Sequence, residues 1–367
     1  MKVMLAMSGG VDSSVAGALL LRAGHDVVGV TMKLWGGDSD SGCCSVSDVD
    51  DARRVAQQLD IDHLVFNFGD EFDRHVVEPY VRDHALGVTP NPCIECNRHV
   101  KFDRLLERAD QLGFDAVATG HHARIGRDGE GRYTLERGAD AAKDQSYVVH
   151  MLDQHDLGRT MFPVGDIDKG EVRRLALEMG LRTAAKPDSQ DVCFITRTGG
   201  RETFLGDRIP FRSGTVVDRS GTELGRVAAV EMVTIGQRRG IGLPGGGPKR
   251  YVVDVDVPGG VVTVGDDGDL YRSSARVVDV TWVASPFEGV AMVQCSAHGA
   301  THEATIRRGV RPDDGHVGGS VGGFGGRSAD WIDVEWTAPQ RRIAPGQSVV
   351  VYDLDDRRVI GGGTAAR

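Results

Sequence analysis

The chain has 367 residues, which is long for a single hydrophobic core and predicts two or three domains. Its 40% hydrophobic and 26% charged residues are typical of a globular protein, and a formal charge of −10 argues against an indiscriminate nucleic-acid binder. No apolar run approaches the length of a membrane span, and a strand pattern begins at once, so we expect neither a membrane protein nor a signal peptide. Six cysteines without secretory features indicate a reducing compartment, and we expect a cytoplasmic protein.

The first predicted elements are a strand, a glycine turn and a helix. The apolar run at residues 3–7 stops at Gly9-Gly10, and small and apolar residues at helical spacing follow directly. Because glycines allow positive φ, the backbone amides of the turn and of the helix start can form an anion site. Three serines place hydroxyls near these amides: Ser8, Ser13 and Ser14. The spacing differs from the Walker A motif and predicts another kind of phosphate loop; the alternative is an ordinary capped helix.

Strands and helices alternate up to about residue 195. Further buried strands are predicted at residues 27–32, 64–68 and 116–119. Amphipathic helices are predicted at residues 48–59, 101–112 and 169–179. This alternation predicts a doubly wound parallel sheet that binds its ligands beyond the carboxyl ends of the strands.

After about residue 200 the helical pattern gives way to short valine-rich runs separated by Gly and Pro. They predict antiparallel strands at residues 214–217, 251–257, 261–264, 275–282, 290–296, 304–308, 331–336 and 348–352. The glycine-rich run 315–326 predicts a mobile loop. We therefore expect an α/β domain at residues 1–200, a small β-rich domain at 201–273 and a β-barrel at 274–367.

The negative charge is unevenly distributed. Residues 201–367 hold 20 Lys and Arg against 21 Asp and Glu, so nearly all of the excess lies in the first 200 residues. Arginine clusters in the second part could hold a polyanion locally, or could simply be solvated: Arg238-Arg239, Arg307-Arg308 with Arg311, and Arg341-Arg342.

Two cysteines lie three residues apart after a stiff proline-rich approach, in Thr89-Pro-Asn-Pro-Cys-Ile-Glu-Cys. A thiol at the start of a helix beside Arg98 and Lys101 has its thiolate favoured, which makes it a nucleophile. The Cys93-x-x-Cys96 spacing also suits half of a zinc site or a redox pair, although no second pair of ligands is visible. Taken by itself, Cys193 could be either a buried hydrophobic residue or a reactive thiol. No pattern indicates a role for Cys43, Cys44 or Cys295.

Six motifs in this order resemble one family, the bacterial tRNA-specific 2-thiouridylases (the MnmA/TrmU family) of the N-type ATP pyrophosphatase superfamily. They are Ser-Gly-Gly-Val-Asp-Ser (8–13), Thr-Pro-Asn-Pro-x-x-x-Cys-Asn (89–97), Ala-Thr-Gly-His-His (118–122), Lys-Asp-Gln-Ser-Tyr (143–147), Asp-Ser-Gln-Asp-Val-Cys-Phe-Ile (188–195) and Gly-Gln-Arg-Arg-Gly (236–240). The resemblance runs from the first strand to near residue 362. It implies a transferase that uses ATP to convert the wobble uridine in the anticodon arm of tRNA to 2-thiouridine, releasing AMP and pyrophosphate.

The resemblance also implies roles for individual residues. ATP would be bound by Ala6, Met7, Ser8, Gly9, Gly10, Val11, Asp12, Ser13, Met32 and Gly120. The target base would lie against Asn91, Pro92 and Cys93. The tRNA would be contacted by His121, Lys143, Asp144, Gln145, Arg307, Arg308 and Gln347. From the oxygen preference of hard cations, we expect Asp12 to orient Mg²⁺.

Cys96 would be the nucleophile of the family and Cys193 its persulfide carrier, and the two could form a disulfide after sulfur transfer. The persulfide would come from a donor such as a cysteine desulfurase or a relay carrier. Many family members have Asp where this chain has Cys93, so the role of that Asp as a base does not carry over. Cys93, Cys96 and Cys193 instead form a three-thiolate set that could hold a [4Fe–4S] cluster.

Two other functions stay open at this point. Another adenylating synthetase of the same superfamily would need neither Cys96 nor Cys193, and serine substitutions would leave its turnover intact. A non-catalytic redox or zinc module that binds RNA would form no AMP. Such a module would leave the loop at residues 8–13 without a purpose. For base extrusion from tRNA we expect a flexible lid, with residues 245–247 and Arg238-Arg239 as candidates.

Overall fold

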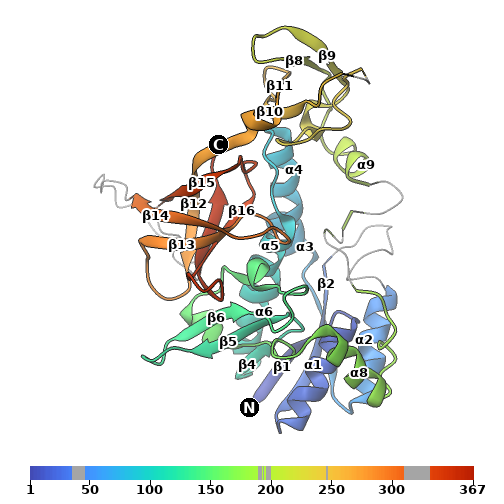
Figure 1. Cartoon of the computed structure of the whole chain (residues 1–367). Helices are drawn as coiled ribbons and strands as arrows, with labels where there is room; N and C mark the ends of the chain where they lie inside the picture. Colours follow the sequence, from blue (N-terminus) through green and yellow to red (C-terminus); the bar gives the residue numbers. More distant parts are fainter. Residues whose placement is uncertain (35–45, 189–191, 193, 196–199, 245–246, 310–330) are drawn as a thin grey trace, which may run out of the picture.

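Figure 1 shows the computed structural model, which describes residues 1–34, 46–188, 192, 194–195, 200–244, 247–309 and 331–367. A parallel sheet holds the N-terminus at one end of the molecule. A small sheet within residues 214–265 lies at the other end, and a β-barrel within residues 271–365 lies between them (Figure 1). The predicted fold class is confirmed: an α/β sheet is followed by a small β-rich unit and a barrel.

Five parallel strands form the N-terminal sheet in the order β3-β2-β1-β4-β7. They are β1 (Lys2–Ala6), β2 (Asp26–Lys33), β3 (His63–Asn67), β4 (Ala116–Ala118) and β7 (Thr160–Met161). Strand β1 is buried on both faces, with Met4 in one core cluster and its neighbours Val3 and Leu5 in the other. The strand order reverses between β1 and β4, and such a reversal is where open α/β sheets bind ligands.

Helices cover both faces of this sheet. One face packs against α1 (Val11–Arg22), α2 (Val46–Gln58) and α8 (Lys169–Glu178). The other face packs against two interrupted helices. The first consists of α3 (Gly69–Phe72), a π-helical turn (Asp73–Val77) and α4 (Glu78–Ala85), and the second of α5 (Pro92–Glu95), a π-helical segment (Cys96–Asp103) and α6 (Arg104–Gln111). The helix predicted at 101–112 therefore begins nine residues earlier, and its first turns carry both cysteines of the Cys-x-x-Cys motif.

The small sheet has the order β10-β11-β8-β9. Its strands are β8 (Gly214–Val217), β9 (Glu223–Val227), β10 (Tyr251–Asp256) and β11 (Val261–Gly265). A short helix α9 (Gly200–Gly206) precedes it, and a 3₁₀ turn (Val230–Met232) follows β9. The expectation of purely antiparallel pairing is wrong here, because β11 pairs with β8 in parallel. The long connection after β9 carries the chain across the sheet, so β10 lies at the opposite edge and its hairpin partner runs along β8.

Six antiparallel strands close into a barrel in the order β12-β15-β14-β13-β16-β17, with β17 returning to β12. They are β12 (Tyr271–Trp282), β13 (Gly289–Gln294), β14 (His302–Gly309), β15 (Trp331–Arg341), β16 (Ser348–Tyr352) and β17 (Arg358–Ala365), and a 3₁₀ turn (Asp267–Leu270) precedes them. Inward residues such as Val277, Ile306 and Val334 fill the barrel core. Sequence analysis did not predict β17, whose run of three glycines hides its strand pattern.

A hairpin from the N-terminal half extends the barrel sheet. Its strands β5 (Ala123–Arg127) and β6 (Tyr133–Arg137) precede a 3₁₀ turn (Ser146–Val149) and α7 (Gln154–Gly158). Strand β6 pairs with β17, with Leu135 opposite Val359. The eight strands therefore form one continuous sheet that fixes the barrel against the residues that follow β4 (Figure 1).

Several expectations concern residues outside this description. The structure does not describe the glycine-rich run 315–326 or two of the three residues of the proposed lid at 245–247. It also does not describe Cys43, Cys44 and Cys193. Arg238 and Arg239 are described and exposed. Among the helices that are described, none has the length and apolar character that crossing a membrane requires.

Candidate active site

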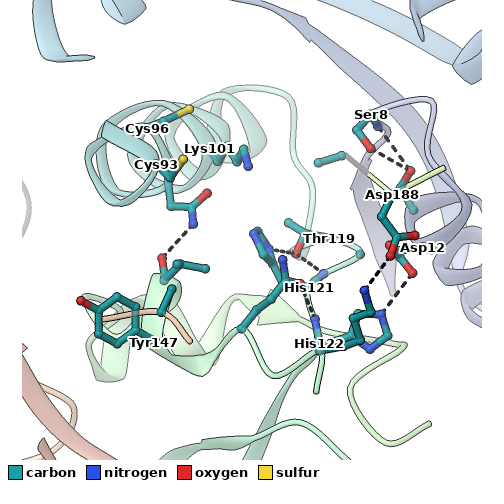
Figure 2. Close-up of a pocket in the computed structure, with 18 of the residues that line it drawn as sticks. Ser8, Asp12, Cys93, Cys96, Lys101, Thr119, His121, His122, Tyr147 and Asp188 are labelled. Carbon is teal, nitrogen blue, oxygen red and sulfur yellow. Dashed lines mark hydrogen bonds and ion pairs between the residues drawn. The ribbon is translucent and has the colours of Figure 1, made fainter. Parts of the chain in front are cut away.

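A cavity of about 540 Å³ lies beyond the carboxyl ends of β1 and β4. It brings together residues from five of the six motifs. The Gly-Gln-Arg-Arg-Gly motif and the arginines Arg307 and Arg308 of the barrel do not line it. Of the residues singled out in the sequence, those lining it are Ala6, Met7, Ser8, Asp12, Ser13, Met32, Pro92, Cys93, Cys96, Lys101, Gly120, His121, Lys143, Asp144 and Gln145. Figure 2 shows the two cysteines on one wall and Ser8, Asp12 and Asp188 on the opposite wall, with His121 between them.

The turn after β1 has the geometry of an anion site. Gly9 has φ +72°, and a Cβ on it would lie 2.3 Å from the carbonyl oxygen of Asp48, so only glycine fits. Gly10 is the N-cap of α1, and no side chain caps the helix there. The first amides of α1 lack carbonyl partners within the helix, so they are available to an anionic ligand.

The three serines of this turn do different things. Ser14 is fully buried, and its hydroxyl donates to the carbonyl oxygen of Gly10 over 2.7 Å. The hydroxyl of Ser13 also contacts the Gly10 carbonyl, at 3.2 Å, and accepts from the amide of Ser8. Ser14 therefore stabilises the turn, whereas Ser8 is exposed on the cavity wall.

The loop after β4 packs closely against the start of α1. A Cβ on Gly120 would lie 2.6 Å from the amide nitrogen of Ser13, so a side chain at this position would displace the phosphate loop. This contact explains why a glycine follows β4 at the strand-order reversal. It also places His121 and His122 at the cavity.

Asp12 lies in a network of charges. Its two carboxylate oxygens each lie 2.7 Å from the Lys169 ammonium, and His122 Nε2 lies 3.1 Å from Oδ1. Burial alone would raise the pKa of Asp12, but the hydrogen bonds with His122 and Lys169 outweigh it and hold the pKa below its usual value. Asp12 is therefore an ionised carboxylate whose oxygens contact Lys169 and His122, and its expected role in orienting Mg²⁺ stays a prediction.

His121 is a neutral imidazole. Its Nδ1 lies 2.7 Å from the Thr119 hydroxyl, and its ring packs near Phe102 and Phe162. Complete burial, with further contributions from the charges of Lys101 and His122, lowers the pKa of His121 to about 3. At neutral pH His121 offers hydrogen bonds but no positive charge to a ligand in the cavity.

The cysteine-bearing helix is capped by a predicted base-binding residue. The side chain of Asn91 accepts from the amide of Cys93 over 3.1 Å, and Pro92 occupies the first helical turn. Asn97 lies inside the π-helical segment, and its side chain donates to the carbonyl oxygen of Val148. Cys96 is buried and Cys93 half-buried, and both line the cavity.

The segment that carries Cys193 approaches this helix. The amide of Val192 donates to the sulfur of Cys93 over 3.4 Å. Val192 and Phe194, the described neighbours of Cys193 in the chain, both line the cavity. Cys193 itself lies outside the described residues, and its disulfide with Cys96 stays a prediction.

The residues expected to contact tRNA lie in two places. Lys143, Asp144 and Gln145 line the cavity, where Asp144 accepts from Arg137 and Gln145 accepts from the amide of His122. Two of these three side chains are thus used in holding the site together. The barrel residues lie away from the cavity lining: Arg307 pairs with Glu335 on the surface, the amide of Arg308 donates to Glu288, and Gln347 donates to the carbonyl oxygen of Thr89.

Sequence analysis assigned no site role to Lys169, Asp188 or His122. Asp188 and His122 lie inside motifs that carry the family resemblance, and those motifs could have indicated a role for them. The sequence predicts Lys169 only as the first residue of an amphipathic helix. Ala297 and His298 of the barrel also line the cavity, and only the folded chain shows this. Over the part of the chain that is described, no group of three or more His, Cys, Asp or Glu side chains is placed to hold a metal ion.

Comparison with known proteins gives the family. The family model described as tRNA methyl transferase HUP domain matches residues 1–197, the tRNA methyl transferase PRC-barrel domain matches 202–266, and the aminomethyltransferase beta-barrel domain matches 326–365. A tRNA-specific 2-thiouridylase MnmA from Herpetosiphon aurantiacus is 44% identical over 99% of this chain and 97% of its own length. The chain belongs to the tRNA-specific 2-thiouridylase family.

Further relatives of this family agree along the whole chain. The MnmA protein of Chloroflexus aggregans is 46% identical over 100% of this chain and 98% of its own. Among solved structures, a 4-thiouridine synthetase–RNA complex with bound ATP is 21% identical, covers 53% of this chain and 44% of its own, and has a TM-score of 0.33. The resemblance to 2-thiouridylases drawn from six motifs is thus confirmed by full-length relatives.

Proposed function

We propose that this protein is an ATP-dependent sulfurtransferase that converts the wobble uridine of tRNA to 2-thiouridine. Full-length identity of about 44% to relatives named tRNA-specific 2-thiouridylase carries the proposal. The cavity supports it, because an anion-binding turn and two thiols line the same space. A uracil C2 oxygen leaves poorly, so sulfur transfer needs both an activating phosphate donor and a sulfur nucleophile.

The first step uses the α1 wall. ATP binds with its phosphates at the amides of residues 8–13, beside Met32 and Gly120, and MgATP brings the magnesium as part of the substrate. Uracil O2 attacks the α-phosphorus, the bond from that phosphorus to the bridging oxygen breaks, and pyrophosphate leaves with the electron pair. The oxygen on C2 is now bonded to the α-phosphorus, so it can leave as part of AMP, a good leaving group.

The second step uses the cysteine wall. The outer sulfur of a persulfide on Cys193 attacks C2 and AMP leaves; the Cys96 thiolate then attacks the Cys193 sulfur, which frees the thiocarbonyl and leaves a Cys96–Cys193 disulfide. Alternatively, Cys96 attacks the persulfide first and releases sulfide, which attacks C2. In both routes a cellular thiol reduces the disulfide, and a cysteine desulfurase or relay carrier reloads Cys193.

A [4Fe–4S] cluster is a separate hypothesis. Cys93 and Cys96 lie one helical turn apart at the cavity, which suits two ligands of a cluster, and Cys193 would be the third. Iron and sulfide analysis after anaerobic purification decides it. A metal-free, fully active protein would end the idea.

The decisive experiment is nucleoside analysis of tRNA after anaerobic incubation with the protein, MgATP and either a persulfide donor or inorganic sulfide. Wild type should form 2-thiouridine, and Cys193→Ser should lose it with the persulfide donor. Equal product from Cys193→Ser with free sulfide would favour sulfide as the attacking species. Release of AMP without any 2-thiouridine would point to another adenylating synthetase. We place the reaction in the cytoplasm, where tRNA and persulfide donors meet.

A further inference from the structure

The residues on both sides of Cys193 in the chain are fixed by contacts to which the steps above give no role. On one side, the amide of Val192 donates to the sulfur of Cys93 over 3.4 Å. On the other side, the Phe194 side chain is buried in a core cluster and only 5% exposed. The amide of Ile195 donates to the carbonyl oxygen of Val192 over 3.1 Å. The described neighbours of Cys193 are thus tied to one another and to the domain.

Three aromatic rings contact the ring of Phe194. Its centre lies 5.6 Å from that of Phe72 in α3, 5.5 Å from that of Tyr80 in α4 and 5.1 Å from that of Phe204 in α9. The interplanar angles of 77°, 90° and 65° are edge-to-face arrangements, which aromatic pairs favour. Phe72, Tyr80 and Phe204, here called the aromatic clamp, therefore hold Phe194 from three helical segments.

The π-helical turn between α3 and α4 allows Phe72 and Tyr80 to reach the same ring. Side chains eight positions apart on a regular α-helix point about 80° apart, at about 100° per residue. A π-helical turn takes up one extra residue, so the effective spacing falls to seven and the two directions differ by only about 20°. The turn at Asp73–Val77 lies between the two aromatic residues in the chain. It therefore brings both rings of the clamp onto the helix face that contacts Phe194.

The backbone before Cys193 is in an unfavourable conformation. Val192 has φ +55°, in the left-handed region that β-branched residues rarely adopt. Such a conformation persists only where the surrounding contacts determine it. Val192 is half-buried and packs against the same core cluster as Phe194. The hydrogen bond to Cys93 and the aromatic clamp are the contacts that hold the chain in this conformation on the two sides of Cys193.

We propose that Phe194 is a positioning residue for sulfur transfer: its ring, seated in the aromatic clamp, holds the adjacent Cys193 at the cavity within reach of Cys96. The inference deepens the proposed function and rests on its use of a Cys193 persulfide. Sulfur on a freely moving segment would meet C2 and Cys96 only by chance encounter, whereas an anchored neighbour keeps the carrier close to both. Phe194 takes part in no bond that forms or breaks, so it changes the rate of the sulfur steps and leaves their chemistry unchanged.

The equilibrium of the Cys96–Cys193 disulfide with glutathione tests the anchor without ATP or tRNA. One oxidised glutathione takes two electrons and two protons from the two thiols and becomes two reduced molecules. Peptide mapping after acid quenching and alkylation identifies this disulfide, and its fraction gives the effective concentration of one thiol at the other. Phe194→Leu keeps an apolar side chain but removes the ring, so it should lower this effective concentration at least about tenfold. Phe72→Leu, which removes one ring of the clamp, should lower it in the same direction.

Phe114→Leu is the matched control. Phe114 is also buried, at 6% exposed, in the same core cluster as Phe194, and its ring lies 4.4 Å from the Lys2 ammonium. It is not among the residues that line the cavity. Phe114→Leu should therefore lose about as much stability in urea as Phe194→Leu and keep the wild-type disulfide equilibrium. Equal shifts of the equilibrium in both variants would overturn the proposal, as would a wild-type protein that forms no Cys96–Cys193 disulfide.

The source of sulfur separates positioning from a general loss of activity. With a persulfide donor, Phe194→Leu should form 2-thiouridine at least about tenfold more slowly than wild type. With inorganic sulfide, which bypasses Cys193, the two proteins should agree within about twofold. An equal loss with both sources also overturns the positioning role. Failure of the proposed function is distinct, because wild type would then form the disulfide but no 2-thiouridine from either source.

Discussion

Gln347 of the barrel donates a hydrogen bond from Nε2 to the carbonyl oxygen of Thr89 over 2.5 Å, across 258 positions of sequence. The amide of Thr89 in turn donates to the carbonyl oxygen of Pro345 over 2.9 Å. Thr89 lies two residues before Asn91, the cap of the helix that carries Cys93 and Cys96. These two hydrogen bonds attach the barrel to the segment that leads into the cysteine helix. The Gln347 side chain is therefore used in a contact within the protein.

Gln347→Ala should lower the free energy of unfolding by about 0.5–1.5 kcal/mol, because the carbonyl of Thr89 loses its side-chain donor. It should also slow thiolation, since the cysteine helix is less firmly placed, while tRNA affinity changes less than twofold. Urea denaturation, a thiolation assay and a tRNA binding titration check the three parts.

Arg307→Ala is the matched comparison on the same barrel. The Arg307 side chain is 65% exposed and pairs with Glu335 at the surface, so its loss should leave stability within about 0.5 kcal/mol. If Gln347→Ala instead weakens tRNA binding and leaves stability unchanged, Gln347 contacts tRNA as the family resemblance implied.

Local patterns predicted much of this architecture. The strands at β1 and β2 and the glycine turn between β1 and α1 follow from apolar runs and from the backbone freedom of glycine, which are properties of neighbouring residues. The start of the cysteine helix was misplaced because Pro92 suggested a stiff extended approach, whereas proline is also favoured in a first helical turn. Helix starts of this kind depend on a cap, here Asn91, that only the structure shows.

The rest of the site depends on contacts between distant segments. The ion pairs of Lys169 with Asp12 and Asp188 join residues from three separate parts of the chain, and no local period reports such a meeting. The pairing of β6 with β17 is equally remote in sequence. The sequence therefore predicted which motifs carry chemistry, and the fold shows how salt bridges and hydrogen bonds arrange them.

Arg137→Met should be strongly destabilising, because Arg137 joins the cavity to the barrel. Its guanidinium contacts Asp144 at 2.6 Å and Asp356 at 2.7 Å, and it lies 3.8 Å from the centre of the buried Tyr352 ring. The substitution leaves the carboxylate of Asp144 buried without its cation, at a cost of about 3–5 kcal/mol by urea denaturation. Arg132→Met, which removes an exposed pair with Asp128, should cost far less stability than Arg137→Met; equal losses would contradict the role of Arg137.

Asp156→Asn should stabilise the protein above neutral pH. Burial, with the nearby charge of Asp153, raises the pKa of Asp156 to about 6. In the unfolded chain this carboxyl ionises near its ordinary pKa, about 4, so ionisation destabilises the folded state as pH rises through 4 to 6. At pH 8 the amide should add about 1–3 kcal/mol to the free energy of unfolding, and below pH 4 the two proteins should be equally stable. A gain that is the same at pH 4 and pH 8 would contradict this explanation.

Cys93→Asp should keep the protein active, because the position suits a carboxylate. Cys93 lies in the first turn of α5, where negative charge is favoured, and the amide of Val192 that now donates to its sulfur can donate to a carboxylate. A carboxylate one helical turn from Cys96 also disfavours the Cys96 thiolate by repulsion between like charges. Thiolation by the variant should therefore be slower than wild type near pH 7 and approach the wild-type rate at higher pH, as a pH–rate profile of 2-thiouridine formation will show. Complete loss of activity at every pH, together with loss of bound iron, would instead identify Cys93 as a ligand of a cluster.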